Sequence, residues 1–358
     1  MTNSQILLLT RQLISIPSTS DNQKALNEAL MLCKKELEGF PVKEFEKNGS
    51  KSLLFSNQNK DLNNFRVILN AHLDVVPAKD NQFNLVEKNG KLFGRGTNDM
   101  KAAAASMIIL FKTLARKLPY AIGLQLVTDE EIGGFNGAKH QIEKGIRCDF
   151  VISGEPTNLG INNKAKGVIW IKIKSFGKTA HGAYLWNGKN AILEMNKFLV
   201  RLTKSFPVPL KESWETTVNV ASVECTNKTF NKVPDDCSIL LDVRYIPQDK
   251  DTFVERIKSL LPKDFTMETQ VNEPSQDTDE DNEFIKLLKK STKKITGRQY
   301  PVIVKHGAAD VRHFNQIGCA GITFGPMGEG LHSDEEWVET EGLSIYFEIL
   351  KDFLLSVK

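Results

Sequence analysis

The segment FRVILNAHLDVVP, at residues 65–77, combines a predicted strand with two polar side chains at its end. Its first part is a run of apolar residues that predicts a buried strand, and its second part places His72 and Asp74 where that strand ends. Residues i and i+2 share a face of an extended chain, so these two side chains point the same way. This arrangement suits a metal-binding imidazole that is oriented by a carboxylate, and an exposed His–Asp pair in a loop is the alternative.

Strand-like and helical segments alternate on both sides of this stretch. Apolar spacing predicts helices over residues 4–39, with a break at 16–18, and over 99–118, 137–144, 309–316 and 342–357, with another that ends at 296. Strands are expected over residues 65–73, 122–127, 149–153, 300–305 and 321–324. This alternation predicts an α/β fold with a mostly parallel sheet that is flanked by helices.

The pattern changes near residue 167. Residues 168–176, VIWIKIKSF, alternate between apolar and polar, which is typical of a sheet with one solvated face. The strands and helices expected up to residue 271 follow a β-α-β-β-α-β order, the split βαβ arrangement of a ferredoxin-like α+β domain, and the acidic residues 272–282 resemble a linker. We therefore predict a discontinuous domain of residues 1–166 and 278–358, interrupted by an inserted domain of residues 167–277.

Composition excludes several classes of protein. The 358 residues are 41% hydrophobic, which is enough for two hydrophobic cores. The net charge is only +3 and the basic residues form no long run, so no nucleic-acid partner is expected. No segment approaches the ~18 apolar residues of a membrane span. The N-terminus lacks the pattern of a secretory signal, and the five cysteines are scattered, so we expect a cytoplasmic protein with reduced thiols.

Two more acidic motifs lie between the predicted elements. Asp99 ends the turn GRGTND before a helix, where the alternative is a helix N-cap, and the missing third glycine argues against a nucleotide site. Glu130 and Glu131 follow Asp129 in TDEEIGG, directly after a strand. Three adjacent acids repel one another unless a cation is present, although a solvated acidic loop is the alternative. Because neighbouring side chains of an extended segment face opposite ways, one glutamate can bind a metal while the other faces substrate.

Two further segments complete the set. Glu155 follows a strand in SGEPT, and His332 ends the glycine-rich GPMGEGLH that follows the last strand. Ligand sites of parallel sheets lie at the carboxyl ends of the strands, so these side chains are expected to converge with those above. Together the motifs offer histidine nitrogens and carboxylate oxygens, the donors that zinc accepts. The sequence therefore predicts a metal site.

These motifs, HLDVVP, GRGTNDMK, TDEEIGG, SGEPT and GPMGEGLHSDEEWVE, resemble the di-zinc exopeptidase and deacylase family of acetylornithine deacetylase, succinyl-diaminopimelate desuccinylase, aminoacylase and glutamate carboxypeptidase. The resemblance runs in order from about residue 5 to the C-terminus. It implies two Zn²⁺ ions per subunit, for which Co²⁺ or Mn²⁺ are possible substitutes. It also implies a cis peptide bond after the bridging aspartate. The implied ligands are the bridging Asp99, His72 and Glu155 at one ion, and Glu131 and His332 at the other, with Glu130 as general base. Asp74, which shares a face with His72, is the expected catalytic partner that orients this histidine.

The implied function is hydrolysis of the amide bond of N-acyl amino acids or short peptides. Two Zn²⁺ ions and three carboxylates leave a single positive charge, which a metal-bridging hydroxide neutralises, and Glu130 then takes the proton of the attacking water. A deacylase like acetylornithine deacetylase or succinyl-diaminopimelate desuccinylase is the main hypothesis. A di- or aminopeptidase of the same family is the alternative, and a non-catalytic binding protein on this fold is a remote one.

The resemblance implies that the inserted domain acts as a lid and that the protein forms a homodimer through it. His181 matches a family histidine that reaches an active site across the dimer, and Arg244 and Asn231 match residues that hold the carboxylate of a small substrate, although a structural ion pair is the alternative for Arg244. Two segments depart from the family pattern, GAYLW at 182–186 and HGAAD at 306–310, so acetylornithine itself is a doubtful substrate. The remaining histidines have no motif context as ligands: His140, His306 and His313.

Overall fold

The computed structural model describes residues 2–358, and the chain divides into two compact units. The first unit comprises Met1–Lys164, Gln276–Val304 and Ala309–Lys358, and the second comprises Ala165–Ser275 and Lys305–Ala308. Each unit has its own hydrophobic core. We propose that these units are the interrupted domain and the inserted domain that the sequence predicts.

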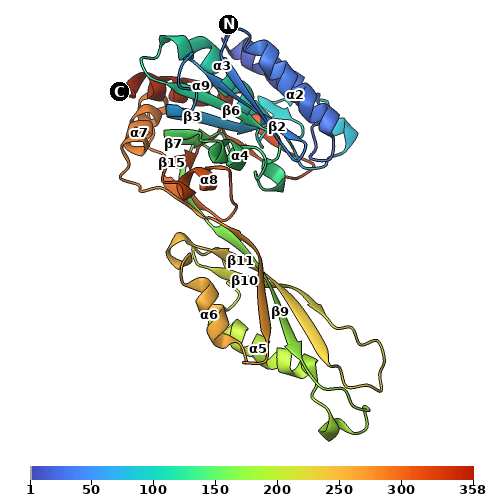
Figure 1. Cartoon of the computed structure of the whole chain (residues 1–358). Helices are drawn as coiled ribbons and strands as arrows, with labels where there is room; N and C mark the ends of the chain where they lie inside the picture. The colour runs from blue at the N-terminus through green and yellow to red at the C-terminus, as the bar shows by residue number, and fades with distance from the viewer. Residues whose placement is uncertain (1) are drawn as a thin grey trace. The chain divides into compact units, whose positions relative to one another are not determined.

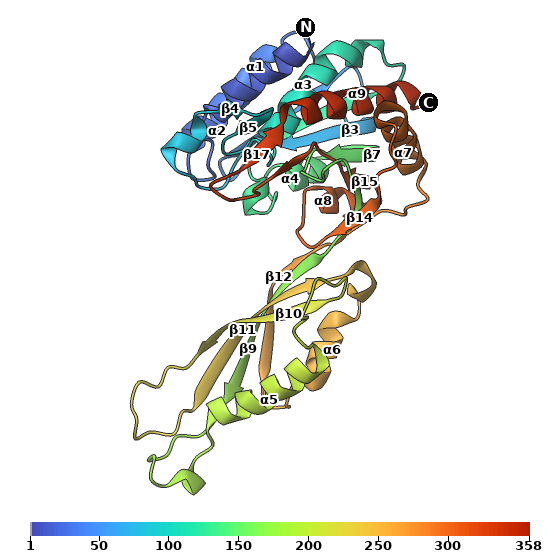
Figure 2. The same ribbon diagram turned by 180° about the vertical axis from the view of Figure 1, so that it is seen from behind.

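A nine-stranded sheet forms the centre of the first unit, in the order β1-β2-β6-β3-β7-β15-β8-β13, with β14 paired to β8 (Figures 1 and 2). Its four central strands, β6, β3, β7 and β15, are parallel, and the neighbouring β2 and β8 are antiparallel to them. The predicted α/β class with a mostly parallel sheet is confirmed. The strands span β1 Val42–Lys47, β2 Ser50–Ser56, β3 Asn64–His72, β6 Ile122–Val127, β7 Arg147–Ser153, β8 Ile161–Ala165, β13 Gln276–Asp277, β14 Val302–Lys305 and β15 Ala320–Thr323.

Helices cover both faces of this sheet because its central strands are apolar on both sides. Along β3, Val67, Leu69 and Ala71 join one core cluster, whereas Phe65 and Ile68 join another on the opposite face. The first cluster includes residues of α1, α2, α3, α7 and α9, and the second includes residues of α4 and α8. These helices span α1 Thr2–Ile14, α2 Gln23–Glu36, α3 Lys101–Leu114, α4 Ala138–Glu143, α7 Glu283–Thr296, α8 Val311–Gln316 and α9 Thr340–Ser356. The carboxyl ends of the parallel strands therefore open at one edge between two helical layers.

The second unit is a four-stranded antiparallel sheet in the order β10-β11-β9-β12, covered by two helices. Its elements follow the predicted β-α-β-β-α-β order: β9 Gly167–Phe176, α5 Ala191–Ser205, β10 Thr217–Glu224, β11 Asp236–Tyr245, α6 Phe253–Leu260 and β12 Thr266–Glu273. Alternate residues of β9 and β11 are buried, as their period of two requires.

Several elements differ from the sequence prediction. The hairpin β1–β2 is unforeseen, although Asn48 and Gly49, with φ of 49° and 83°, form the tight turn that joins its strands. A small sheet of β16 Gly328–Glu329, β17 Trp337–Glu339, β5 Lys91–Phe93 and β4 Val86–Lys88 was also missed. The predicted linker at 272–282 is wrong in part, because β12 extends to Glu273 and β13 lies within it.

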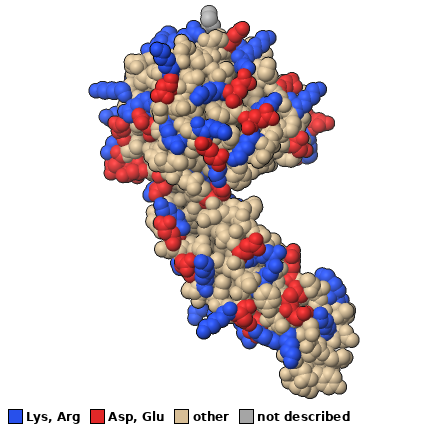
Figure 3. All heavy atoms as spheres, viewed as in Figure 1, with Lys and Arg blue, Asp and Glu red and all other residues tan. Residues whose placement is uncertain are grey.

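Charged side chains of both signs are mixed over the face shown in Figure 3. On that face, and among the described residues, neither sign forms a large separate patch. Within residues 2–358, none of the helices combines the length and the apolar character needed to cross a membrane.

Candidate metal centre

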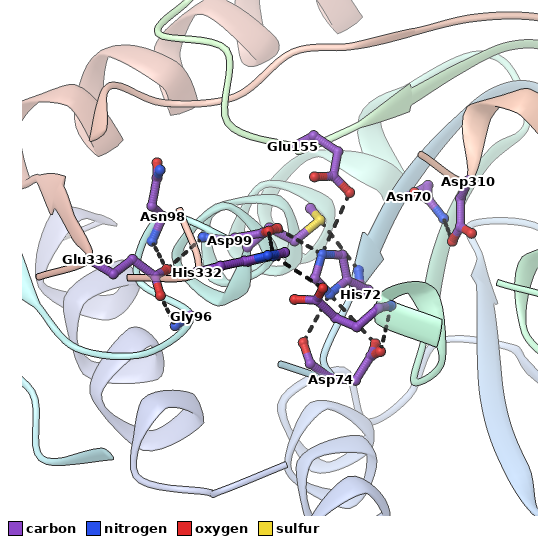
Figure 4. Close-up of polar contacts among 12 residues, drawn as sticks. Asn70, His72, Asp74, Gly96, Asn98, Asp99, Glu155, Asp310, His332 and Glu336 are labelled. Carbon is purple, nitrogen blue, oxygen red and sulfur yellow. Dashed lines mark hydrogen bonds and ion pairs between the residues drawn. The ribbon is translucent and has the colours of Figure 1, made fainter. Parts of the chain in front are cut away.

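Five separate segments of the first unit bring the predicted ligands to one edge of the central sheet (Figure 4). The side chains come from the end of β3, the residue pair before α3, the 3-10 turn after β6, and the loops after β7 and β15. These residues are His72, Asp99, Glu130, Glu131, Glu155 and His332. The convergence has a simple origin, since the carboxyl ends of neighbouring parallel strands meet at one edge.

Asp99 lies between the two histidines. One carboxylate oxygen, Oδ1, is 3.0 Å from His72 Nε2, and the other, Oδ2, is 3.2 Å from His332 Nε2. The peptide bond between Asp99 and Met100 is cis, as the resemblance implied. A carboxylate with each oxygen facing a different imidazole has the form of a bridge between two ligand groups.

Each histidine also faces a glutamate. His72 Nε2 is 3.6 Å from Glu155 Oε1, and His332 Nε2 is 3.2 Å from Glu131 Oε2. Each histidine therefore has one glutamate and one oxygen of Asp99 beside it, and the assignment of these side chains to two ions stays a prediction. The nitrogen and oxygen donors in each group are those of zinc and related divalent ions.

Glu130 lies close to the first of these groups. Potential ligand atoms of His72, Glu130 and Glu155 are within 4.8 Å of one another, as are those of His72, Asp99 and Glu131. Position alone therefore does not distinguish Glu130 from the ligands. Burial raises the pKa of the Glu130 carboxyl well above its usual value, and the neighbouring charge of Glu155 raises it further. A carboxyl group with a raised pKa is suited to exchanging protons near neutral pH.

Asp74 contacts both His72 and Glu131. His72 Nδ1 is 3.0 Å from the backbone carbonyl of Asp74 and 3.6 Å from its Oδ1, while Asp74 Oδ2 accepts the backbone N–H of Glu131 at 3.0 Å. Because a carbonyl can only accept, Nδ1 carries a proton and donates it. The other nitrogen, Nε2, is then the one that faces Asp99 and Glu155, as a ligand nitrogen must.

The carboxylates around the two histidines carry negative charge that cations would offset. Burial lowers the pKa of His72, but hydrogen bonds to Asp74 and Asp99 outweigh it and raise that pKa well above its usual value. Hydrogen bonds to Asp99 and Glu131 raise the pKa of His332 to about 10. The direction of both pKa shifts indicates that the neighbouring carboxylates favour positive charge at these positions. In addition, Glu131 Oε1 is buried and finds no hydrogen-bond partner among residues 2–358. The residues present thus fit a pair of metal ions, which would supply that positive charge.

The other predicted residues lie in the second unit. His181 forms an isolated β-bridge with Lys232, which places it beside Asn231, and Gly182 donates its backbone N–H to the Asn231 carbonyl at 2.7 Å. Arg244 pairs with Asp242 on the same strand, with Nε 3.0 Å from Oδ1. The roles of His181, Asn231 and Arg244 toward the metal centre remain predictions.

One buried acid in the first unit was missed as a site residue. Glu336 pairs with Arg95 at 2.6 Å and accepts three backbone N–H groups of the turn that ends at Asp99. Glu336 lies inside a quoted motif, in the run Asp334–Glu335–Glu336, where nothing in the sequence distinguishes a buried acid from its exposed neighbours. Its partners lie far away along the chain, so sequence spacing gives no signal for them.

Comparisons with known proteins find similar proteins along nearly the whole chain. Residues 68–356 match the sequence profile of Peptidase family M20/M25/M40. The chain is similar to succinyl-diaminopimelate desuccinylase of Wigglesworthia glossinidia brevipalpis, with 28% identity over 98% of this chain and 99% of the relative. The fold is similar to that of aminopeptidase PepT from Bacillus cereus ATCC 10987, with a TM-score of 0.81, 21% identity and 98% of each chain covered. It is also similar to the YXEP protein of Bacillus subtilis, described as a dinuclear metal binding peptidase from the M20 family, with a TM-score of 0.72, 14% identity and coverage of 99% and 98%.

Metal addition gives a direct test of the centre. Adding Zn²⁺ to chelator-treated protein is expected to raise the melting temperature, because a ligand at 100 times its Kd stabilises the folded state by about 2.7 kcal/mol. Asp99→Asn removes the charge shared by both ligand groups and should abolish most of that rise. Thermal denaturation with and without metal measures it. The exposed Asp281, paired only at the surface with Lys286, gives the matched control Asp281→Asn. An equal rise in the Asp99 variant would contradict the site.

Proposed function

The chain belongs to peptidase family M20/M25/M40, and we propose that it cleaves the amide bond of N-acyl amino acids with two metal ions and Glu130 as general base. Zinc is the proposed metal, and Co²⁺ or Mn²⁺ are possible substitutes because the donor set does not select among them. One observation supports the proposal above the others: the two oxygens of Asp99 each face a histidine that also faces a glutamate. In the proposed assignment, His72 and Glu155 hold one ion, Glu131 and His332 hold the other, and Asp99 holds both.

When bound, the two ions supply Lewis-acid chemistry, since they make water more acidic and polarise the substrate carbonyl. Glu130 accepts a proton from the attacking water, whose oxygen forms a bond to the carbonyl carbon. As the carbon–nitrogen bond breaks, Glu130 passes that proton to the leaving amine. Its place beside His72 and Glu155, with potential ligand atoms within 4.8 Å of one another, supports this role. Asp74 keeps the imidazole of His72 in its orientation.

The inserted domain is proposed to supply the remaining groups. His181 would donate to the developing oxyanion across a homodimer, and Arg244 and Asn231 would hold the free carboxylate of the substrate. Arg244 Nε donates hydrogen bonds to the carboxylate of Asp242, which supports a fixed orientation for the arginine side chain. The homodimer, the lid role of the domain and a cytoplasmic location are parts of this proposal.

The substrate class is proposed from the relatives. Desuccinylases match nearly the whole chain at 26–28% identity, which favours N-acyl amino acids. The alternative is a short peptide substrate, which is supported by folds similar to those of an aminopeptidase and a tripeptidase. The two substrate classes differ in the group on the acyl side of the cleaved bond. This group is an acyl group such as succinyl or acetyl in an N-acyl amino acid, and an aminoacyl group in a dipeptide.

Glu130→Gln is expected to lower kcat by about 10²–10⁴ while two metal ions stay bound, because the amide keeps the shape of the side chain and loses the proton transfer. Steady-state kinetics and metal content measured on the same sample test this. Glu143→Gln is the matched control, since Glu143 pairs with Lys47 at the surface. Turnover near that of the wild type in Glu130→Gln would reject its role as general base.

Arg244→Met is expected to lower kcat/KM by about 10–100-fold for a substrate with a free α-carboxylate, since a hydrogen bond to a charged group contributes about 1.5–3 kcal/mol. The loss should fall mainly on KM. The same substrate with its carboxylate amidated should show no added loss. Arg201→Met replaces an exposed arginine of α5 in the same unit and is the control. Equal losses for the free and amidated substrates would assign Arg244 a structural role.

A substrate panel separates the two proposed classes. We expect N-succinyl and N-acetyl amino acids to be hydrolysed with a higher kcat/KM than dipeptides that carry the same C-terminal residue, because relatives that match nearly the whole chain carry the name of a desuccinylase. Release of the product amine, measured at equal enzyme and metal concentration, gives the comparison. A preference for dipeptides would favour the peptidase alternative and leave the metal centre as proposed.

A further inference from the structure

Glu336 is a buried acid that no step of the proposed reaction uses. Only 1% of the residue is exposed, and its carboxylate lies against the turn of residues 94–99 that leads to Asp99 (Figure 4). Its Oε1 accepts the backbone N–H groups of Asn98 at 2.8 Å and Asp99 at 2.9 Å. Its Oε2 accepts the N–H of Gly96 at 3.0 Å and the Nη1–H of Arg95 at 2.6 Å.

Four donors on two oxygens leave this carboxylate well satisfied. A buried charge costs several kcal/mol unless it is paired and hydrogen-bonded, and here Arg95, 2% exposed, supplies the opposite charge. A neutral amide in the same place would turn an NH₂ group toward two N–H donors. The turn therefore fits a carboxylate and no other group of that shape.

Side chains pack closely against this turn at Gly96. Gly96 has a φ of 85°, and a Cβ there would lie 3.0 Å from side-chain atoms of both Lys101 and Val75. Lys101 itself is buried and donates to the carbonyls of Leu13 and Ile16 at 3.0 and 2.7 Å. The backbone before Asp99 is thus enclosed on one side by side chains and fixed on the other by the carboxylate of Glu336.

A single segment holds Asp99 at two places. His332 contacts the side chain of Asp99 through Oδ2, and Glu336, four residues later, binds its backbone N–H. The segment that carries both residues turns at Gly330, with a φ of 81°, and at His332, with a φ of 58°. The side chain and the backbone of the bridging residue are therefore set by the same stretch of chain.

We propose that Glu336 is a positioning residue that holds the backbone of Asp99 so that its two carboxylate oxygens face the two metal ions. The proposal rests on the metal centre proposed above. A residue that acts in this way controls metal affinity and the geometry of the ions, whereas a merely structural ion pair controls stability alone. Residues that orient metal ligands typically change metal affinity by about 10–100-fold when they are replaced.

The test uses the full-length protein with Glu336→Gln and the matched control Asp334→Asn. Asp334 is two residues away in the same loop and pairs with Lys79 at the surface. We expect Glu336→Gln to bind Zn²⁺ about 10–100-fold more weakly, measured by competition with a chelator, and Asp334→Asn to bind like the wild type. The absorption spectrum of the Co²⁺-loaded protein should change in intensity in Glu336→Gln only, since it reports the geometry around the ions.

Glu336→Asp provides a second variant if the Gln variant does not fold, because it keeps the charge and shortens the reach. It should weaken metal binding by a smaller factor and lower kcat with little change in KM. Metal affinity and a cobalt spectrum equal to those of the wild type in a folded Glu336 variant would overturn the proposal, even if the melting temperature fell. A wild-type protein that binds no metal would instead overturn the proposed function, and this inference with it.

Discussion

Mutual repulsion among four carboxylates is the main physical problem of the candidate metal centre. Asp99, Glu130, Glu131 and Glu155 converge on two histidines at one edge of the sheet. Such a cluster is costly in the absence of cations, because like charges at a few ångströms in a partly buried site repel strongly. The pKa values of Glu130 and of both histidines are raised in this site, which is the direction that lowers its net negative charge. Divalent ions offset the same charge and leave the carboxylates ionised.

The parallel sheet solves the geometric half of this problem. Its central strands end at one edge, so residues far apart in the chain meet there without long loops. Candidate ligands could be proposed from the sequence because each motif follows a strand or precedes a helix. Their assignment to two ions came from the family resemblance. The helix predicted from residue 99 begins at Lys101, and the strand predicted over 122–127 has those bounds in the structure.

What the sequence did not predict has a common physical cause. Glu336 contacts Arg95 and the backbone before Asp99, more than two hundred residues away, and no periodicity marks such a contact. The hairpin β1–β2 was missed because its first strand, VKEFEK, carries alternating charges and little apolar area. His181, Asn231 and Arg244 differ again, since their proposed roles need an arrangement of the two units. Local pattern predicts elements and donor types, while contacts between distant backbone segments follow from tertiary packing.

Two buried carboxylates that are not proposed ligands complete the centre. Asp74 accepts the backbone N–H of Glu131, and Glu336 accepts that of Asp99, so each binds the main chain of a ligand and leaves the ligand's own oxygens free for the ions. Neither interaction requires metal. The positions of the proposed ligands are therefore set largely by the fold. Metal binding would then cost little free energy for ordering the chain. A centre organised in this way can keep one metal geometry while the residues around the substrate change, because the parts that fix the ions and the parts proposed to hold the substrate lie on different segments of the chain.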